Sequence, residues 1–320
     1  MLSIDCPLCG SRDCIGVATM QDRLLGVEGQ FHMVRCSRCG LHYLNPQPTM
    51  EELVCHYSED YDPFQALSPD ELPLLPRLSL LYGLNKRCRA VDRYKSGGYL
   101  LEIGCATGLF LDAMRRRGYW RVQGVDVSEK AVRYAREALG LEVFHGPVTE
   151  ARFSDDTFDA VVMWDVLEHV HSPRETLLET QRILKPDGVL VIRVPLLDAW
   201  DRRLFGRYWA GWDAPRHLTL FSKHTLDLML TQTGFHVEGT ASISGSYHAF
   251  VLSIRFWARQ YLSPAAQGLL RSILEALPMR LAAAPFFRLV DCLNKSTETM
   301  VVARSAGRRL GPDMMGDEQW

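Results

Sequence analysis

The chain has 320 residues, 47% of them hydrophobic, which is enough for one large globular domain and a small one. Its 36 lysines and arginines nearly balance its 38 aspartates and glutamates, and this balance argues against a nucleic acid partner. The start MLSIDCPLCG lacks the features of a signal peptide, and no apolar run reaches the roughly 20 residues of a bilayer span, so we expect a cytoplasmic protein.

Residues 1–48 contain two C-x-x-C-G motifs, CPLCG and CSRCG. Each motif places two thiolates at a tight turn, where the glycine permits a positive φ. Two such motifs complete the tetrahedral shell of four sulfurs that zinc prefers, and four protein ligands leave the ion no open position. We therefore predict a zinc ribbon that holds a structural zinc. Its predicted ligands are Cys6, Cys9, Cys36 and Cys39.

Residues 49–98 are predicted to be a helical connector. Thr49 and Glu52 have the spacing of a capping box, which marks the start of a short helix. Residues 78–94 have the composition of a longer helix, and several prolines separate the two helical parts. We expect this connector to join the zinc ribbon to the regular part of the chain.

From residue 99 onward, short apolar segments alternate with helical ones. Strands are expected at 99–105, 122–128, 142–148, 158–165, 188–195, 235–243 and 298–305. Parallel strands need a crossover helix between them, so this alternation predicts an α/β fold with a doubly wound, mostly parallel, Rossmann-like sheet. We assign residues 99–248 and 299–306 to this domain.

In such a sheet, a ligand binds outside the carboxyl ends of the central strands. The loop LEIGCATG follows the first strand and has Gly104 and Gly108 at its ends. It does not match the G-x-G-x-x-G of dinucleotide-binding proteins, which argues against a nicotinamide dehydrogenase. Glu102 precedes the loop and would favour a cationic ligand over a pyrophosphate. Asp126 ends the next strand, where a carboxylate can accept both hydroxyls of a ribose.

The segments LEIGCATG, GVDVS, FSDDTFDAVVMWDVLEHV and ILKPDGVLVI together resemble the class I S-adenosylmethionine-dependent methyltransferases, over about residues 99–240. The resemblance implies that S-adenosyl-L-methionine is the cofactor and that the glycine loop holds its methionine end. The segment GPVTEARF, residues 146–153, corresponds to the adenine-contacting region. The cofactor-binding candidates are Glu102, Gly104, Ala106, Gly108, Asp126, Val127, Val148, Thr149, Glu150 and Trp164.

The zinc motifs followed by LHYLNPQPT resemble the zinc-ribbon variants of this family among bacterial small-molecule and sugar methyltransferases. This second resemblance implies a small-molecule or glycan acceptor, and we expect methylation on oxygen. A catalytically inactive zinc-ribbon adaptor with the same fold is the alternative. The retained carboxylates Glu102 and Asp126 argue against it, because a protein without cofactor has no use for acids in an empty cleft.

The segment MWDVLEHVHS holds the candidate catalytic residues Asp165, Glu168 and His169. Their spacing of i, i+3 and i+4 would place them on one face of a helical turn. The pattern acid-x-x-Glu-His resembles that of quinone-precursor O-methyltransferases and small-RNA 2′-O-methyltransferases. In those families it holds a divalent ion, and a downstream histidine, here His217, completes the site in the RNA enzymes.

Three interpretations of this cluster stay open. A divalent ion such as Mg²⁺ could lower the pKa of the accepting hydroxyl, His169 could take its proton directly, or the cluster could be structural. The segment 194–222 is rich in tryptophan and arginine, and we expect it to build the acceptor pocket.

Residues 249–292 are predicted to form an amphipathic helical hairpin with five arginines and only two acids. Such a hairpin can serve as a lid, contact another subunit, or lie in the interface of a membrane with anionic lipid. Peripheral membrane contact would suit an acceptor sugar that is carried on a lipid. The sequence leaves the oligomeric state open.

Overall fold

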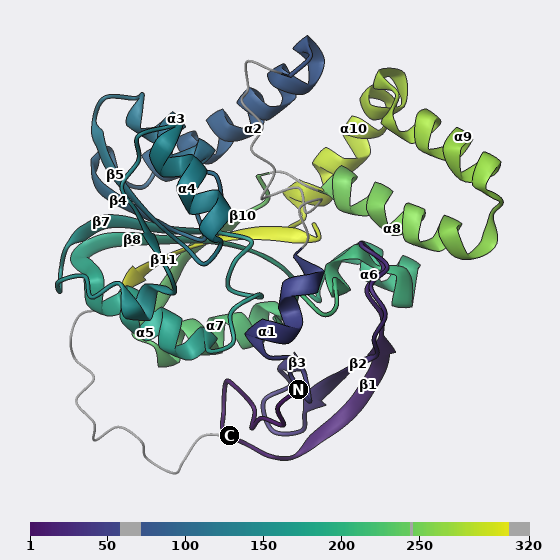
Figure 1. Ribbon diagram of the computed structural model, residues 1–320, viewed down its shortest axis with the longest axis horizontal. Helices are drawn as coiled ribbons and strands as arrows, with labels where there is room; N and C mark the ends of the chain where they lie inside the picture. The colour runs from purple at the N-terminus through teal and green to yellow at the C-terminus, as the bar shows by residue number, and fades with distance from the viewer. Residues whose placement is uncertain (58–71, 244–245, 307–320) are drawn as a thin grey trace. The chain divides into compact units, whose positions relative to one another are not determined.

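The computed structural model describes residues 1–57, 72–243 and 246–306 (Figure 1). The chain divides into two compact units, which are described one at a time. The first unit is Met1–His56, Val194–Leu226 and Thr240–Met300, and the second is Tyr57–Arg193, Asp227–Gly239 and Val301–Trp320. The predicted connector 49–98 is shared between the units, and its residues 58–71 lie outside the described part. None of the described helices is long and apolar enough to cross a membrane.

The second unit is built around a seven-stranded sheet. Across the sheet, the strands are β10 (Phe235–Ala241), β11 (Glu298–Ser305), β8 (Leu184–Pro195), β7 (Phe158–Trp164), β4 (Gly98–Ile103), β5 (Trp120–Asp126) and β6 (Val143–His145). The strands from β8 to β6 all pair in parallel. The predicted doubly wound, mostly parallel sheet is therefore confirmed.

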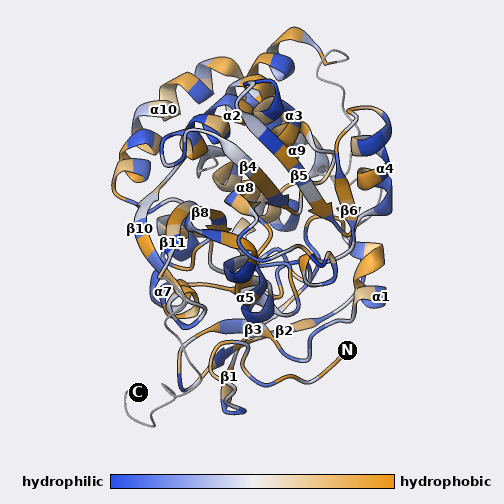
Figure 2. Cartoon of the chain, turned by 90° about the vertical axis from the view of Figure 1, so that its left-hand side faces the viewer, coloured by the Kyte–Doolittle hydropathy of each residue, from blue (hydrophilic) through white to orange (hydrophobic). Residues whose placement is uncertain are grey.

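The order of these strands fixes where a ligand can bind. The chain runs outward from β4 to β5 and β6, and then returns to the other side of β4 to form β7. In a sheet of this order, a ligand binds where the loops leave the carboxyl ends of two neighbouring strands in opposite directions, which here are β4 and β7. The central strands β4 and β7 are mainly hydrophobic, and Figure 2 shows apolar residues in β4, as expected for parallel strands that are buried on both faces.

Local signals explain where the helices of this unit begin. Ser128 caps α4 (Glu129–Glu137), because its hydroxyl accepts a hydrogen bond from Ala131 N. Pro173 occupies the first turn of α5 (Pro173–Ile183), where its missing N–H costs nothing. The remaining helices are α2 (Leu74–Asp92), α3 (Leu109–Arg115) and α7 (Lys223–Gln232), the last of which begins in the first unit.

The first unit holds a smaller, antiparallel sheet. Its strands, in order, are β1 (Cys14–Met20), β2 (Phe31–Cys36), β3 (His42–Leu44) and β9 (Thr219–Leu220). The capping box predicted at Thr49 and Glu52 is present at the start of α1 (Met50–Leu53). Short helices follow: η1 (Val54–His56), α6 (Trp200–Phe205), η5 (Gly206–Tyr208) and η6 (Ala210–Trp212).

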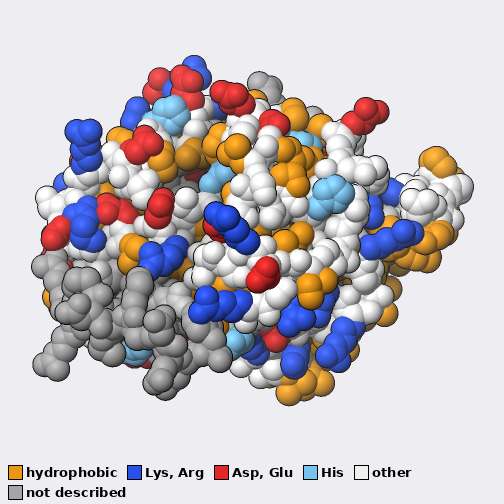
Figure 3. All heavy atoms as spheres, turned by 90° about the horizontal axis from the view of Figure 1, so that it is seen from below, with side chains coloured by type: hydrophobic (Ala, Val, Ile, Leu, Met, Phe, Trp, Pro, Cys, Tyr) orange, Lys and Arg blue, Asp and Glu red, His pale blue; other side chains and the backbone are white. Residues whose placement is uncertain are grey.

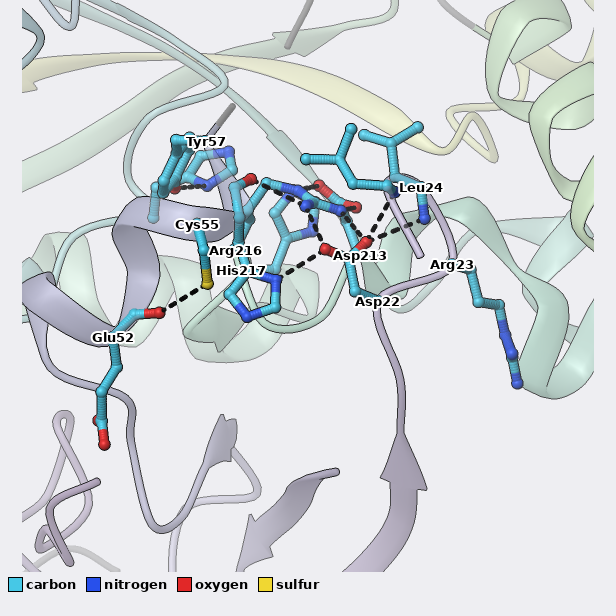
Figure 4. Close-up of polar contacts among 12 residues, drawn as sticks. Asp22, Arg23, Leu24, Glu52, Cys55, Tyr57, Asp213, Arg216 and His217 are labelled. Carbon is cyan, nitrogen blue, oxygen red and sulfur yellow. Dashed lines mark hydrogen bonds and ion pairs between the residues drawn. The ribbon is translucent and has the colours of Figure 1, made fainter. Parts of the chain in front are cut away.

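A buried arginine ties distant segments of this unit together (Figure 4). Arg216, fully buried, donates to both carboxylate oxygens of Asp22 at 3.0 Å, to both of Asp213, and to His56 O at 3.0 Å. These five contacts match the five N–H donors of a guanidinium. Burial alone would raise the pKa of Asp22, but Arg216 and His56 lower it.

The predicted helical hairpin is instead three helices: α8 (Ser246–Tyr261), α9 (Pro264–Glu275) and α10 (Leu277–Cys292). Ser263 caps α9 by accepting a hydrogen bond from Ala266 N, and Pro264 stands in its first turn. A second break comes at Ala276, whose backbone is extended, and Pro278 follows in the first turn of α10. The two prolines restart the helix twice, which a hydrophobicity pattern alone does not reveal.

Candidate functional site

The glycine loop lies between β4 and α3, and its two glycines have left-handed backbone conformations. Gly104 has φ +71°, and a Cβ there would lie 2.4 Å from Val166 Cγ2. Gly108 has φ +80°, and a Cβ there would lie 2.5 Å from Leu141 Cδ1. Both positions therefore require glycine, for conformation and for space. The loop packs directly against the residues that follow β7.

Asp126 shapes this loop from the end of β5. Its Oδ2 accepts a hydrogen bond of 2.7 Å from Ala106 N, and its Oδ1 accepts one of 2.8 Å from Ser128 N. Ala106 has φ +45°, a left-handed conformation that costs energy in a residue with a Cβ. The bond to Asp126 helps to hold it there. The Val127 backbone also contributes a hydrogen bond to this carboxylate, and the lone-pair capacity that remains could accept a hydrogen bond from a ribose hydroxyl.

Two buried polar atoms beside the loop make no hydrogen bond to any described residue: Glu102 Oε2 and Trp164 Nε1. Glu102 is 3% exposed at the end of β4. Burial raises its pKa well above the usual range, the charge of Arg87 opposes this, and the charge of Asp126 raises it further. Buried polar groups of this kind normally have a partner, so these atoms indicate a place for a ligand.

Asp165 does not share a helical face with the other two catalytic candidates. No helix begins at Val166, because residues 167–169 form a turn and Asp165 itself is left-handed, with φ +57°. Its carboxylate instead pairs with Arg193 of β8, whose Nε donates to Oδ1 at 2.8 Å and whose Nη2 donates to Oδ2. Arg193 is 5% exposed and requires a counter-charge inside the protein.

Glu168 and His169 do lie together on this turn. Glu168 is fully buried, and His169 is half-buried. The Tyr57 hydroxyl lies 3.0 Å from His169 Nδ1, a contact that orients the imidazole ring. His217 belongs to the first unit, where its Nδ1 donates to Gly211 O at 2.9 Å. Its role beside His169 stays a prediction.

The predicted adenine region follows β6. Gly146 N donates to Asp126 O at 2.9 Å, which brings this segment to the carboxyl end of β5. Val148 is buried, whereas Thr149 and Glu150 are exposed, as is Val127 at 51%. This arrangement leaves the predicted contacts with adenine untested.

Sequence reasoning missed Arg193 and Arg87. Arg193 gave a signal, because it is the one charged residue in the apolar strand sequence VLVIRVP, and a lone charge in a buried strand needs a partner. Arg87 lies over the Trp164 ring, 5.5 Å from its centre. It gave no signal, since an arginine on a helix is usually solvated.

In the first unit, the four predicted zinc ligands converge. Cys6 Sγ lies 3.5 Å from Cys39 Sγ, Cys9 Sγ lies 3.5 Å from Cys36 Sγ, and the four ligand atoms lie within 4.8 Å of one another. The knuckle glycines Gly10 and Gly40 have φ of +68° and +80°. Four converging sulfurs are a donor set that suits zinc.

The comparisons with known proteins bear on the second unit. Residues 84–239 match the family model described as a methyltransferase domain. They form a methyltransferase domain. The predicted resemblance to S-adenosylmethionine-dependent methyltransferases is thereby confirmed at the level of the family.

Curated relatives of the methyltransferase domain include ubiquinone biosynthesis O-methyltransferases. The mitochondrial protein of Schizosaccharomyces pombe is 36% identical over 105 residues, which are 30% of this chain and 38% of that protein. The Caulobacter vibrioides protein is 34% identical over 99 residues, 29% of this chain and 39% of that protein. The chain thus spans about two fifths of the length of these relatives.

Among solved structures, an S-adenosylmethionine-dependent methyltransferase from Archaeoglobus fulgidus has a TM-score of 0.46 and 18% sequence identity. That match covers 71% of this chain and 94% of the other.

Proposed function

We propose that the protein transfers the methyl group of S-adenosyl-L-methionine to an oxygen atom of a small molecule or glycan. The observation that carries this proposal is the unsatisfied Glu102 Oε2, buried beside the glycine loop of a methyltransferase domain. S-adenosylmethionine carries a cationic ammonium and sulfonium group, and a buried carboxylate favours such a ligand.

The cofactor would extend along the carboxyl ends of β4 and β5. Its methionine end would lie in the loop of Gly104, Ala106 and Gly108, against Glu102. Its ribose would bind the remaining lone pairs of Asp126. Trp164 Nε1 offers a donor at the end of β7. Val127, Val148 and Thr149 are the residues that we propose for the adenosine end.

Methyl transfer forms a bond between carbon and the accepting oxygen, breaks the bond between carbon and sulfur, and releases a proton from the hydroxyl. Alignment of the acceptor with that carbon–sulfur bond supplies much of the rate. We propose that His169 takes the proton. A divalent ion such as Mg²⁺ on Glu168 and His169 is the alternative, since a carboxylate and an imidazole both bind such ions. The Asp165 carboxylate is already paired with Arg193, which argues against Asp165 as a ligand of this ion.

Two experiments test the reaction. Calorimetry should detect binding of S-adenosylmethionine and no binding of NAD; heat with NAD alone would refute the proposal. With labelled methyl donor, His169→Ala should lower turnover about 100-fold or more, with cofactor affinity unchanged. His224→Ala, an exposed histidine on α7, is the control. An equal loss of affinity and turnover in His169→Ala would favour a structural role.

We propose that the four-cysteine cluster holds a structural zinc ion. Elemental analysis should find about one zinc per chain. Cys36→Ser should abolish it, whereas Cys14→Ser, at the start of β1 in the same unit, should keep it. A metal-free, folded wild type would refute the zinc. Thiolate ligands of this kind suit a reducing compartment such as the cytoplasm, which is where we propose that the enzyme acts.

A further inference from the structure

The helix α10 presents an apolar face to solvent. Phe287 and Val290 are buried, so the helix packs through that side. On the other side, Leu281 and Leu289 are 64% and 57% exposed, and Leu293, directly after the end of the helix, is 61% exposed. A helix on the surface of a globular protein normally has polar residues there. Leu269 and Ile273 of α9, 65% and 44% exposed, add to the apolar surface of this helical region.

The acidic and basic side chains of α10 lie in different surroundings. Asp291, the only acid in this helix, accepts hydrogen bonds of 2.7 to 2.9 Å from Ser242, Ser246 and Ser296. Arg280 and Arg288 are exposed, and neither guanidinium makes a hydrogen bond or ion pair with a residue that the structure describes, although the charge of Arg280 acts on Tyr247 of α8. Asp291 is thus hydrogen-bonded to residues of its own unit, whereas the two arginines and the leucines are exposed to solvent.

We propose that the exposed face of α10 is a docking surface for a membrane that contains anionic lipid. The leucines would enter the boundary between headgroups and acyl chains, and the two arginines would pair with lipid phosphates. Figure 3 shows the molecule from below, where apolar and basic side chains lie close together on the side of α8 and α9; α10, which packs with both helices, lies on the far side of this view. The inference deepens the proposed function, because it places the enzyme where a lipid-linked acceptor is found.

Charge favours a membrane over a second copy of the chain. In a symmetric dimer the same surface meets itself, so Arg280 and Arg288 would face the same arginines of the other copy. The exposed face of α10 offers no acid to neutralise them. Glu275 of α9 is already paired with Arg271 at 2.9 Å. An anionic lipid surface removes this repulsion, whereas self-association creates it.

Co-sedimentation of the full chain with vesicles tests the proposal. Binding is expected to vesicles of phosphatidylcholine with phosphatidylglycerol, to weaken with salt, and to be much lower with phosphatidylcholine alone. The double variant Arg280→Gln, Arg288→Gln should lower the partition coefficient roughly tenfold or more. Leu281→Asp with Leu289→Asp should lower it at least as much.

Matched controls lie on other helices. Leu178→Asp on α5 and Arg133→Gln on α4 change exposed residues of the same types and should leave vesicle binding unchanged. Circular dichroism of each variant checks that it is folded; the arginine variants alter only exposed groups. The proposal is overturned if the wild type does not bind, or if the control variants lose binding equally.

Light scattering tests whether a second copy of the chain, and not a membrane, binds to the exposed face of α10. A dimer that Leu281→Asp with Leu289→Asp converts to a monomer, without change in vesicle binding, would make this face a subunit interface and overturn the proposal. Calorimetry with S-adenosylmethionine on the same samples separates this question from the proposed function. The surface variants should bind the cofactor as the wild type does, so a failure of docking leaves the methyltransferase proposal intact.

Discussion

Two buried charged groups in this protein differ in whether all of their hydrogen-bonding atoms have a partner. Arg216 in the first unit has an acceptor for each of its five N–H donors, and all of them come from the same unit. Glu102 in the second unit keeps a buried oxygen that no described residue satisfies. A complete network stabilises a fold, whereas an incomplete one lowers stability and creates a demand for a ligand. The contrast separates the structural charges from the functional ones.

The largest effect is expected when the complete network is broken. Arg216→Ala removes the guanidinium from the buried Asp22 and the half-buried Asp213, and should lower the free energy of unfolding by about 3–5 kcal/mol. Arg12→Ala in the same unit removes an exposed pair with Asp5, at 3.3 Å, and should cost less than about 1 kcal/mol. Urea denaturation measures both. Similar losses of unfolding free energy in the two variants would mean that the buried network stabilises the fold no more than an exposed ion pair does.

Glu102→Gln should act in the opposite direction on stability and on binding. Cofactor affinity should fall about tenfold or more, which is about 1.4 kcal/mol, because the carboxylate for the cationic group is lost. Thermal stability without cofactor should rise. An acid whose pKa is raised by folding is increasingly destabilising as the pH rises above its unfolded pKa of about 4.3, and glutamine carries no such cost. Glu137→Gln, exposed on α4, should change neither quantity.

The same raised pKa gives cofactor binding a pH dependence. Below the pKa of Glu102 in the free protein the carboxyl is protonated, and a cationic ligand favours its ionised form, so binding releases a proton. Affinity should therefore rise with pH and level off above that pKa. Calorimetry in buffers of different ionisation enthalpy measures the proton release, which Glu102→Gln should remove. Proton release that persists in the variant would assign it to another group.

Ala106→Gly tests the smallest effect. Glycine adopts φ +45° without the Cβ penalty, so the variant should gain about 0.5–1 kcal/mol of stability if the loop keeps its path. Ala131→Gly in α4 is the control and should lose about 1 kcal/mol or more, because glycine is unfavourable within a helix. Destabilisation by Ala106→Gly would show that the methyl group packs in a way that outweighs the strain.

Much of the fold followed from patterns of short range. The strand at 298–305 lies where the sequence predicted it, since its pattern depends on residues within a few positions. The positive φ of the knuckle glycines Gly10 and Gly40 was also predictable, because the turn of a C-x-x-C-G motif is local. The pairing of Asp165 with Arg193 was not, since the partners are 28 residues apart on different strands. That pairing changed what Asp165 can contribute to the candidate site.

The sequence by itself determined which chemical groups are present and in which local frames: the two cysteine knuckles, the glycine loop and the order of strands and helices. Tertiary structure alone decided which buried charges meet. Asp22 and Arg216 are 194 residues apart, and no local pattern links them. Short-range patterns act through backbone geometry over one or two turns, whereas the partner of a buried charge is chosen when distant segments pack, because desolvation then penalises any group left without one.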